Sequence, residues 1–334
     1  MNKGSDGMNT IVGIDVSKTR LDCAYHTDLA ANKVKTKVWS NDPVGIGHLQ
    51  SWAVSKLGVG IDQITFIMEA TGVYHERLAY ALHEAGAQVV VVNPAQVRDY
   101  AKSLAIRSKN DRKDSMVLAR FGATQPWRAW QPEPPAVREL KALLARLSAL
   151  EKDLQRERNR REKAQVSAAS TQVQDSIQWV IEALEQERQR LEQLIDDHIN
   201  RHPGLKQDTE LLESIPGVGP VLSRHMLAVF HSRAFRNARQ MAAYLGLVPL
   251  EHTSGTSVRG RPRLSKTGSA NIRAKLYLPA VVALRHNPHA KAFYERLLAR
   301  GKSKMAAIGA VMRKLVHICF GVLKHQQPYA PSVS

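Results

Sequence analysis

The chain of 334 residues is 43% hydrophobic and 23% charged, which is ordinary for a folded protein of two or three domains. Its 48 Lys and Arg against 30 Asp and Glu give a net charge of +18, which favours a nucleic acid partner over a merely basic surface. Cys23 and Cys319 are far apart and suggest no disulfide framework. We expect neither a signal peptide nor a membrane span, which excludes a secreted or membrane protein and favours the cytoplasm.

The first third of the chain begins with a polar tail, residues 1–9, that we expect to be disordered. Strands are predicted over 11–17, 21–27, 33–41, 64–70 and 87–92, and helices over 43–57, 74–86, 94–105 and 111–123. Three consecutive strands followed by alternation with helices predict a mixed sheet covered by helices, in an α/β domain over residues 10–126.

Residues 127–203 are expected to be a linker followed by two long helices. A proline- and tryptophan-rich segment ends at Pro135, and apolar residues then recur with 3-4 spacing from Leu140 to Leu154 and from Ile177 to Ile195. The stripes flank a polar stretch at 156–176 that is expected to be a solvated face or a turn. They predict packing surface in an antiparallel helical hairpin or a coiled coil.

Residues 204–328 are expected to form an all-α domain. Helices are predicted from about 208 onward and over 237–245, 269–285 and 303–324, with a loop rich in glycine and arginine over 251–268. Between two helices lies the turn Ile215–Pro220, in which Gly217 and Gly219 leave backbone N–H groups that can hold a phosphate. This pattern resembles the helix-hairpin-helix of many DNA-binding proteins, although such a glycine also serves a plain turn.

Four carboxylates of the first domain are the candidate catalytic residues. Asp15 lies within one apolar strand and Glu69 ends another, where an unpaired charge is costly. Asp111 and Asp114 are three residues apart and share one face of a predicted helix. If the four converge, they form a site for a hard divalent cation that can polarise a scissile phosphate.

The loop after His252 combines hydroxyl residues with positive charge. Six basic residues and no acidic one follow His252 up to and including Lys275. Five of them are predicted to bind nucleic acid, namely Arg259, Arg261, Arg263, Lys266 and Arg273. A hydroxyl such as Ser254 could attack a phosphodiester held by the guanidinium groups. From the residues alone, the more ordinary interpretation prevails: the hydroxyls form turns and the arginines contact backbone phosphates.

Taken together, these segments resemble the DEDD transposases of bacterial insertion sequences, the family one-ten group of bridge-RNA-guided recombinases. The matching segments are Gly13-Ile14-Asp15, Glu69-Ala70-Thr71-Gly72, Val92-Asn93-Pro94-Ala95, Lys109 to Asp114, Ser214 to Gly219, Ser254 to Gly260 and Ser265-Lys266-Thr267-Gly268. Their order and spacing span roughly residues 10–325, nearly the whole chain.

The resemblance implies a RuvC-like (ribonuclease H type) first domain, a coiled-coil insertion and a helical transposase domain. It implies that Asp15, Glu69, Asp111 and Asp114 bind Mg²⁺, with Mn²⁺ able to replace it. It also changes the interpretation of the loop, because Ser254 matches a nucleophilic serine that joins DNA through a phosphoserine bond. Thr253, Thr256 and Ser257 are neighbouring hydroxyls that leave the attacking one open.

The partners implied by the resemblance are donor DNA, target DNA and a structured guide RNA encoded by the element. The serine and the carboxylates of one active site come from different subunits of a dimer or tetramer. The expected function is an insertion-sequence transposase, cytoplasmic and associated with the nucleoid when on DNA. The alternatives are a site-specific DNA invertase of the same family, a metal-dependent nuclease or Holliday-junction resolvase that uses water, and a non-catalytic DNA-bridging protein.

Overall fold

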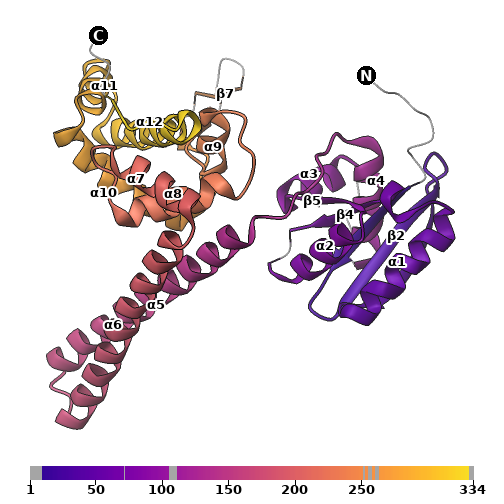
Figure 1. The fold of residues 1–334 in the computed structure, drawn as a ribbon, viewed down its shortest axis with the longest axis horizontal. Coiled ribbons are helices and arrows are strands. Elements are labelled where there is room, and N and C mark those ends of the chain that lie inside the picture. The colour runs from indigo at the N-terminus through magenta and orange to yellow at the C-terminus, as the bar shows by residue number, and fades with distance from the viewer. Residues whose placement is uncertain are drawn as a thin grey trace. The chain divides into compact units, whose positions relative to one another are not determined.

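The computed structural model describes residues 10–70, 72–104, 111–250, 253–254, 258–259 and 263–330. The side chains of residues 111, 112, 253, 254, 258, 259 and 263 are outside this description, as are the expected tail at 1–9 and most of the loop at 251–262. The chain divides into two units, Met1–Pro132 and Glu133–Ser334 (Figure 1). Each unit has hydrophobic clusters of its own.

The first unit is built on a mixed sheet of five strands in the order β3-β2-β1-β4-β5. The strands are β1 (Ile11–Val16), β2 (Arg20–Asp28), β3 (Lys33–Ser40), β4 (Thr65–Glu69) and β5 (Gln88–Val92). β2 is antiparallel to β1 and β3, whereas β1, β4 and β5 are parallel. The mixed sheet predicted from the sequence is confirmed, with strand bounds within about a residue or two of those expected.

Helices cover both faces of this sheet because its side chains alternate between two hydrophobic clusters. They are α1 (Pro43–Leu57), α2 (Tyr74–Glu84), α3 (Pro94–Ser103) and α4 (Asp111–Thr124), with a short 3-10 turn at Ile61–Gln63. Val12 and Ile14 pack with α1 and α2, whereas Ile11 and Ile67 pack with α3 and α4. The odd-numbered positions of β1 and β4 therefore face α4.

The second unit begins with two long antiparallel helices, α5 (Pro135–Val166) and α6 (Thr171–Asn200), which extend away from the rest of the unit (Figure 1). The leucine and isoleucine residues of both stripes are buried or half-buried, as expected of packing surface. The polar stretch at 156–176 is mostly helical, with the turn confined to residues 167–170. The structure thus contains the predicted hairpin, and a coiled coil with a second chain stays a prediction.

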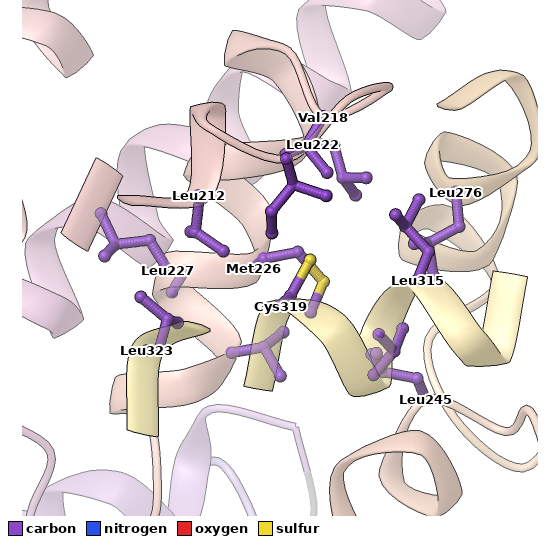
Figure 2. Packing of buried hydrophobic residues seen from close by; sticks show 14 of the residues in the cluster. Leu212, Val218, Leu222, Met226, Leu227, Leu245, Leu276, Leu315, Cys319 and Leu323 are labelled. Carbon is purple, nitrogen blue, oxygen red and sulfur yellow. The ribbon is translucent and has the colours of Figure 1, made fainter. Parts of the chain in front are cut away.

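The remaining helices form a bundle around one hydrophobic core (Figure 2). They are α7 (Pro203–Glu213), α8 (Pro220–His231), α9 (Ala238–Tyr244), α10 (Ala270–His286), α11 (Pro288–Ala299) and α12 (Lys304–His325). Met226 of α8 and Cys319 of α12 are fully buried at its centre. Two pairs of very short strands lie between α9 and α10: β6 (Pro249–Leu250) with β9 (Arg263–Leu264), and β7 (Thr253–Ser254) with β8 (Val258–Arg259).

Two elements of the bundle correct expectations from the sequence. Helix α11 was not predicted, although its start carries a clear signal: the side chain of Asn287 accepts a hydrogen bond from the N–H of Ala290 and is followed by Pro288. Contrary to expectation, α12 has the length and apolar composition to cross a membrane. However, 56% of its most apolar window is buried inside the protein, as in the core helix of a soluble domain.

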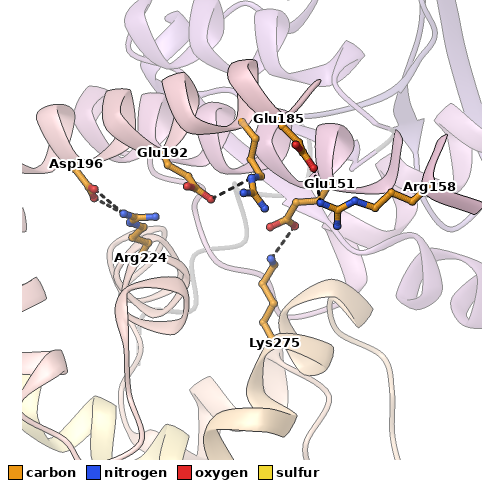
Figure 3. A network of polar contacts seen from close by, with 8 residues as sticks. Glu151, Arg158, Glu185, Glu192, Asp196, Arg224 and Lys275 are labelled. Atoms are coloured by element: carbon orange, nitrogen blue, oxygen red, sulfur yellow. Dashed lines mark hydrogen bonds and ion pairs between the residues drawn. The ribbon is translucent and has the colours of Figure 1, made fainter. Parts of the chain in front are cut away.

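Polar contacts fix the hairpin on the bundle (Figure 3). The guanidinium of Arg224 on α8 donates to both carboxylate oxygens of Asp196 on α6, at 2.5 and 2.7 Å. The ammonium of Lys275 on α10 donates to Glu151 on α5 at 3.0 Å. These pairs are partly exposed, so each contributes about 1 kcal/mol or less, and they define orientation more than stability.

Candidate catalytic site

The carboxylates of Asp15 and Glu69 are placed by two adjacent parallel strands. β1 and β4 pair in the register Ile14↔Met68, and Asp15 and Glu69 are the next residue of each strand. They continue the rows that begin at Ile11 and Ile67, so both lie on the face covered by α4. Neighbouring strands are about 4.8 Å apart, which puts the two Cα atoms side by side at the carboxyl end of the sheet.

Helix α4 runs antiparallel to β1, and glycines at their contact determine how close it lies. A Cβ on Gly13 would collide with the backbone of Ser115 and Ala119, and one on Gly122 would collide with side chains of Ile67 and Ile11. Gly122 is thus level with the start of β1, and the segment from Ser115 to Ala119 is level with its middle. Two strand residues span about 6.6 Å, or roughly four helical residues, so Asp15 is level with the first turn of α4.

That first turn holds Asp111 and Asp114. The backbone geometry therefore brings the four predicted positions to one end of the sheet. Among the side chains that the structure describes, no three from Asp, Glu, His and Cys stand close enough to share a metal ion. The side chain of Asp111 is outside the described set, so binding of a metal by the four stays a prediction. Carboxylate oxygens are nevertheless the donors that a hard divalent cation takes.

A fifth carboxylate at this end was missed by the sequence analysis. Asp22 of β2 is the cross-strand partner of Asp15 in the antiparallel pair β1–β2, and it is 7% exposed. It forms an ion pair with Arg20 at 2.9 Å, which compensates its charge. The signal in the sequence was a single acidic residue, Asp22, within the apolar run from Leu21 to Tyr25.

The turn between α7 and α8 gives its two glycines different surroundings. Gly217 has φ +98° and packs against α10, where a Cβ would lie 3.0 Å from the carbonyl oxygen of Pro279. Gly219 is exposed, with open space around it at the start of α8. The carboxylate of Glu213 accepts a hydrogen bond from Ser223 in the first turn of α8, at 2.7 Å. Of the two predicted phosphate ligands, Gly219 is the one with room for a phosphate.

Ser254 lies in the hairpin β7–β8 of the second unit, where its backbone pairs with Val258. Its side chain and residues 255–257 are outside the description, as are the side chains of Arg259, Arg261 and Arg263. The question of which hydroxyl attacks, and the nucleic-acid contacts of these arginines, therefore stay predictions.

The two ends of this loop are held together at its base. Ser265 N–H donates to the carbonyl of Val248 at 2.8 Å, and a Cβ on Gly268 would collide with the backbone at Tyr244 and Leu245. Arg273 Nη1 donates to the carbonyls of Leu245 and Gly268, at 3.2 and 2.6 Å. Of the predicted nucleic-acid-binding residues, Arg273 thus closes the base of the loop, while the exposed Lys266 adopts a left-handed backbone there.

Comparison with known proteins decides the family. A model for DEDD-type IS110 transposases matches residues 12–169, and one described as the transposase IS116/IS110/IS902 family matches residues 209–295. The chain is 32% identical over 322 residues to the pilin gene-inverting protein of Moraxella bovis, covering 96% of this chain and 97% of that protein. The chain belongs to the IS110 family of transposases. The transposase for insertion sequence element IS1111A of Coxiella burnetii is 25% identical over 274 residues, or 73% of each chain.

Membership of the IS110 family confirms the resemblance found in the sequence, and it makes the chain a DNA recombination enzyme. One matched segment covers the sheet with its four helices and continues through α5, and the other runs from α7 to α11. Both candidate groups, the carboxylates and the start of the hydroxyl loop, therefore lie within segments characteristic of IS110 transposases.

Proposed function

We propose that this IS110-family chain cuts and rejoins DNA through a covalent phosphoserine intermediate, with Ser254 as nucleophile and Asp15, Glu69, Asp111 and Asp114 as ligands of Mg²⁺. The observation that carries the proposal is the placement of Asp15 and Glu69 side by side, level with the first turn of α4. A sheet in the order β3-β2-β1-β4-β5, with the carboxylates at the ends of its central strands, is also consistent with a RuvC-like domain.

The chemistry balances without an external energy source. The Ser254 oxygen attacks the phosphorus, a P–O bond of the DNA strand breaks, and the released strand end takes up a proton. A hydroxyl of the second strand then attacks the same phosphorus and regenerates the serine, so the phosphodiester energy is conserved. When bound, Mg²⁺ supplies polarisation of the phosphate oxygens. The chain's own carboxylates hold it, and its arginines hold the strand.

The proposal includes the partners that the family resemblance implies. Donor and target DNA are the substrates, a structured RNA encoded by the element selects them, and a dimer or tetramer assembles the carboxylates and serine from different subunits. The net charge of +18 supports polyanionic partners. The site of action is the cytoplasm, on the nucleoid.

A second function, site-specific inversion of a DNA segment, is favoured by one observation. Similarity to the Moraxella bovis pilin gene-inverting protein extends over 96% of this chain, against 73% for the Coxiella burnetii transposase. A plasmid assay separates the two: recombination between inverted sites within one plasmid indicates an invertase, and transfer of the element to a new plasmid indicates a transposase.

The test of the proposed chemistry is covalent trapping of DNA on the protein. We expect Ser254→Ala to lose the denaturant-stable protein–DNA adduct and to reduce strand exchange by at least about a thousandfold. Ser257→Ala, Thr253→Val and Thr256→Val are matched controls that keep the adduct. We expect Asp15→Asn to lose strand exchange while DNA binding persists.

Three results would refute this assignment. An adduct that persists in Ser254→Ala excludes that residue as the nucleophile. Strand cleavage that survives Ser254→Ala but disappears in Asp15→Asn indicates a nuclease or resolvase that uses water. If strand exchange is unaffected by Asp114→Asn, the carboxylates are not catalytic, and a DNA-bridging role is the better interpretation.

A further inference from the structure

The positive charge of the chain is concentrated in its last part. Residues 214–334 contain 19 of the 48 Lys and Arg but only two of the 30 acidic residues, Glu251 and Glu295. Nearly the whole net charge of +18 therefore belongs to the segment that begins at the turn before α8. The predicted loop arginines account for three of these 19 cations, so most of them lie elsewhere in the bundle.

Three of the other cations lie on the adjoining helices α9 and α12. Arg239 is exposed on α9, Lys314 is exposed on α12, and Arg313 beside it is half-buried. None of the three forms an ion pair with another residue that the structure describes. We call this group, together with His317, the α9–α12 face.

His317 reports the electrostatic environment of this face. It follows Arg313 by four residues and Lys314 by three, so all three share one side of α12. Its pKa is lowered first by burial and then by the charges of Arg313, Lys314 and Arg239, with no carboxylate acting in the opposite direction. Its Nε2 atom is buried and has no hydrogen-bond partner among the described residues. The face therefore has unbalanced positive charge.

The α9–α12 face adjoins the loop that carries the hydroxyl residues. A Cβ on Gly309 of α12 would lie 3.5 Å from a methyl group of Leu264 in β9, which is the strand that closes this loop. Arg313 follows Gly309 by one helical turn, and His317 follows by two. The cations thus begin about one turn of α12, roughly 5 Å, beyond the contact with the loop.

We propose that the α9–α12 face binds the phosphodiester backbone of the DNA strand on which the Ser254 loop acts, next to the point of cleavage. This rests on the proposed function. Arg239, Arg313 and Lys314 each contact phosphate oxygens, and they hold the strand in place without reading its sequence. The face is distinct from the loop arginines, because it is carried by two helices of the folded bundle.

The test compares two triple variants that remove the same number of charges. The first is Arg239→Gln, Arg313→Gln, Lys314→Gln. The control is Arg156→Gln, Arg158→Gln, Arg190→Gln in the α5–α6 hairpin. Each of these arginines forms an ion pair, with Asp153, Glu185 and Glu187 respectively. Binding of the full-length protein to duplex DNA is measured against salt concentration, because each phosphate contact contributes about 0.9 to the slope of log affinity against log salt.

We expect the first variant to reduce that slope by about 2.5 and to weaken binding at least about tenfold at 0.1 M salt, uniformly across DNA sequences. We expect the hairpin variant to change the slope by less than about 0.5. Equal effects of the two variants would show that only net charge matters, and would overturn the proposal. A loss confined to a structured RNA, with DNA binding unchanged, would overturn it too.

Two further measurements separate this inference from folding and from the catalytic proposal. The thermal unfolding temperature of the first variant should match that of the unmodified chain; if it does not, the single changes at exposed Arg239 and Lys314 are used, each expected to reduce the slope by about 0.9. The Ser254→Ala variant should keep the full slope. Loss of the covalent protein–DNA adduct therefore tests the role of Ser254 as nucleophile. A smaller slope of log affinity against log salt tests DNA binding by the α9–α12 face.

Discussion

The two halves of the second unit differ in their balance of basic and acidic residues. Residues 133–213, which include the α5–α6 hairpin, contain 13 Lys and Arg and 16 Asp and Glu, whereas residues 214–334 contain 19 and two. On the hairpin, Arg158 pairs with Glu185 and Arg190 with Glu187. On the bundle, the cations of the α9–α12 face have no such partners among the described residues. The charges of the hairpin are thus largely neutralised within it, whereas the excess positive charge of the bundle suits contacts with a polyanion.

The largest effect should come from the base of the hydroxyl loop, where the bundle allows no added atom. We expect Gly268→Ala to destabilise the bundle by about 2–3 kcal/mol and to reduce strand exchange more than DNA binding, because its Cβ collides with the backbone at Tyr244 and Leu245. Chemical denaturation and strand-exchange assays measure the two effects. Gly204→Ala in α7 is the control, because a Cβ there meets nothing within 4 Å. Equal stability of both variants would contradict the tight packing of this base.

A pH effect of similar or smaller size should come from the contact between the hairpin and the bundle. His225 of α8 is buried, and its pKa is lowered to about 4, first by burial and then by Lys275 and Arg224. Because the unfolded chain binds this proton at higher pH than the folded one, stability is full above about pH 6.5 and falls as the pH drops toward 4. We expect this residue to account for up to about 3 kcal/mol of that loss.

The contribution of His225 is isolated by comparing unfolding of the unmodified chain and of His225→Gln between pH 4 and 7. The variant should lose less stability on acidification than the unmodified chain, although both lose some through carboxylates. The control substitution is His202→Gln. His202 follows α6 of the same hairpin, and its ring forms a hydrogen bond with the carbonyl of His198 at 2.7 Å. Identical pH profiles for His225→Gln and the unmodified chain would show that folding does not lower the pKa of His225.

The smallest effect should come from the exposed pairs of the hairpin. We expect Arg190→Gln to leave the free energy of unfolding unchanged within the error of the measurement, because the ion pair of Arg190 with Glu187 is exposed and screened by solvent. DNA affinity should also stay the same. A strong loss of DNA binding in this single variant would remove the distinction between hairpin and bundle.

Much of the sheet unit could be predicted from the sequence because its elements follow simple patterns. The strands are short apolar runs separated by polar turns, and Val89 to Val92 lies in a strand as expected. Register could not be predicted, since it depends on pairing between distant segments. Without it, neither the side-by-side placement of Asp15 and Glu69 nor the cross-strand position of Asp22 could be derived from spacing alone.

The helical unit was harder to predict in its details. Helix α11 was not predicted, although Asn287 and Pro288 mark a helix start. The role of Arg273 was also beyond the sequence, because its hydrogen bonds go to carbonyls of Leu245 and Gly268 that are brought together only by the fold. A basic residue in a cationic loop does not reveal whether it contacts phosphate or its own backbone.

The close approach of α4 to β1 at Gly13 has a consequence for how the enzyme responds to ionic strength. This contact is close packing of backbone against backbone, with Ser115 and Ala119 against the glycine and no ion pair among these three residues, so dissolved ions do not weaken it. Contacts between exposed cations and phosphates, by contrast, are lost as salt rises. A salt concentration that dissociates DNA from the protein should therefore leave intact the end of the sheet that carries Asp15 and Glu69. Dilution of the salt should restore activity without refolding.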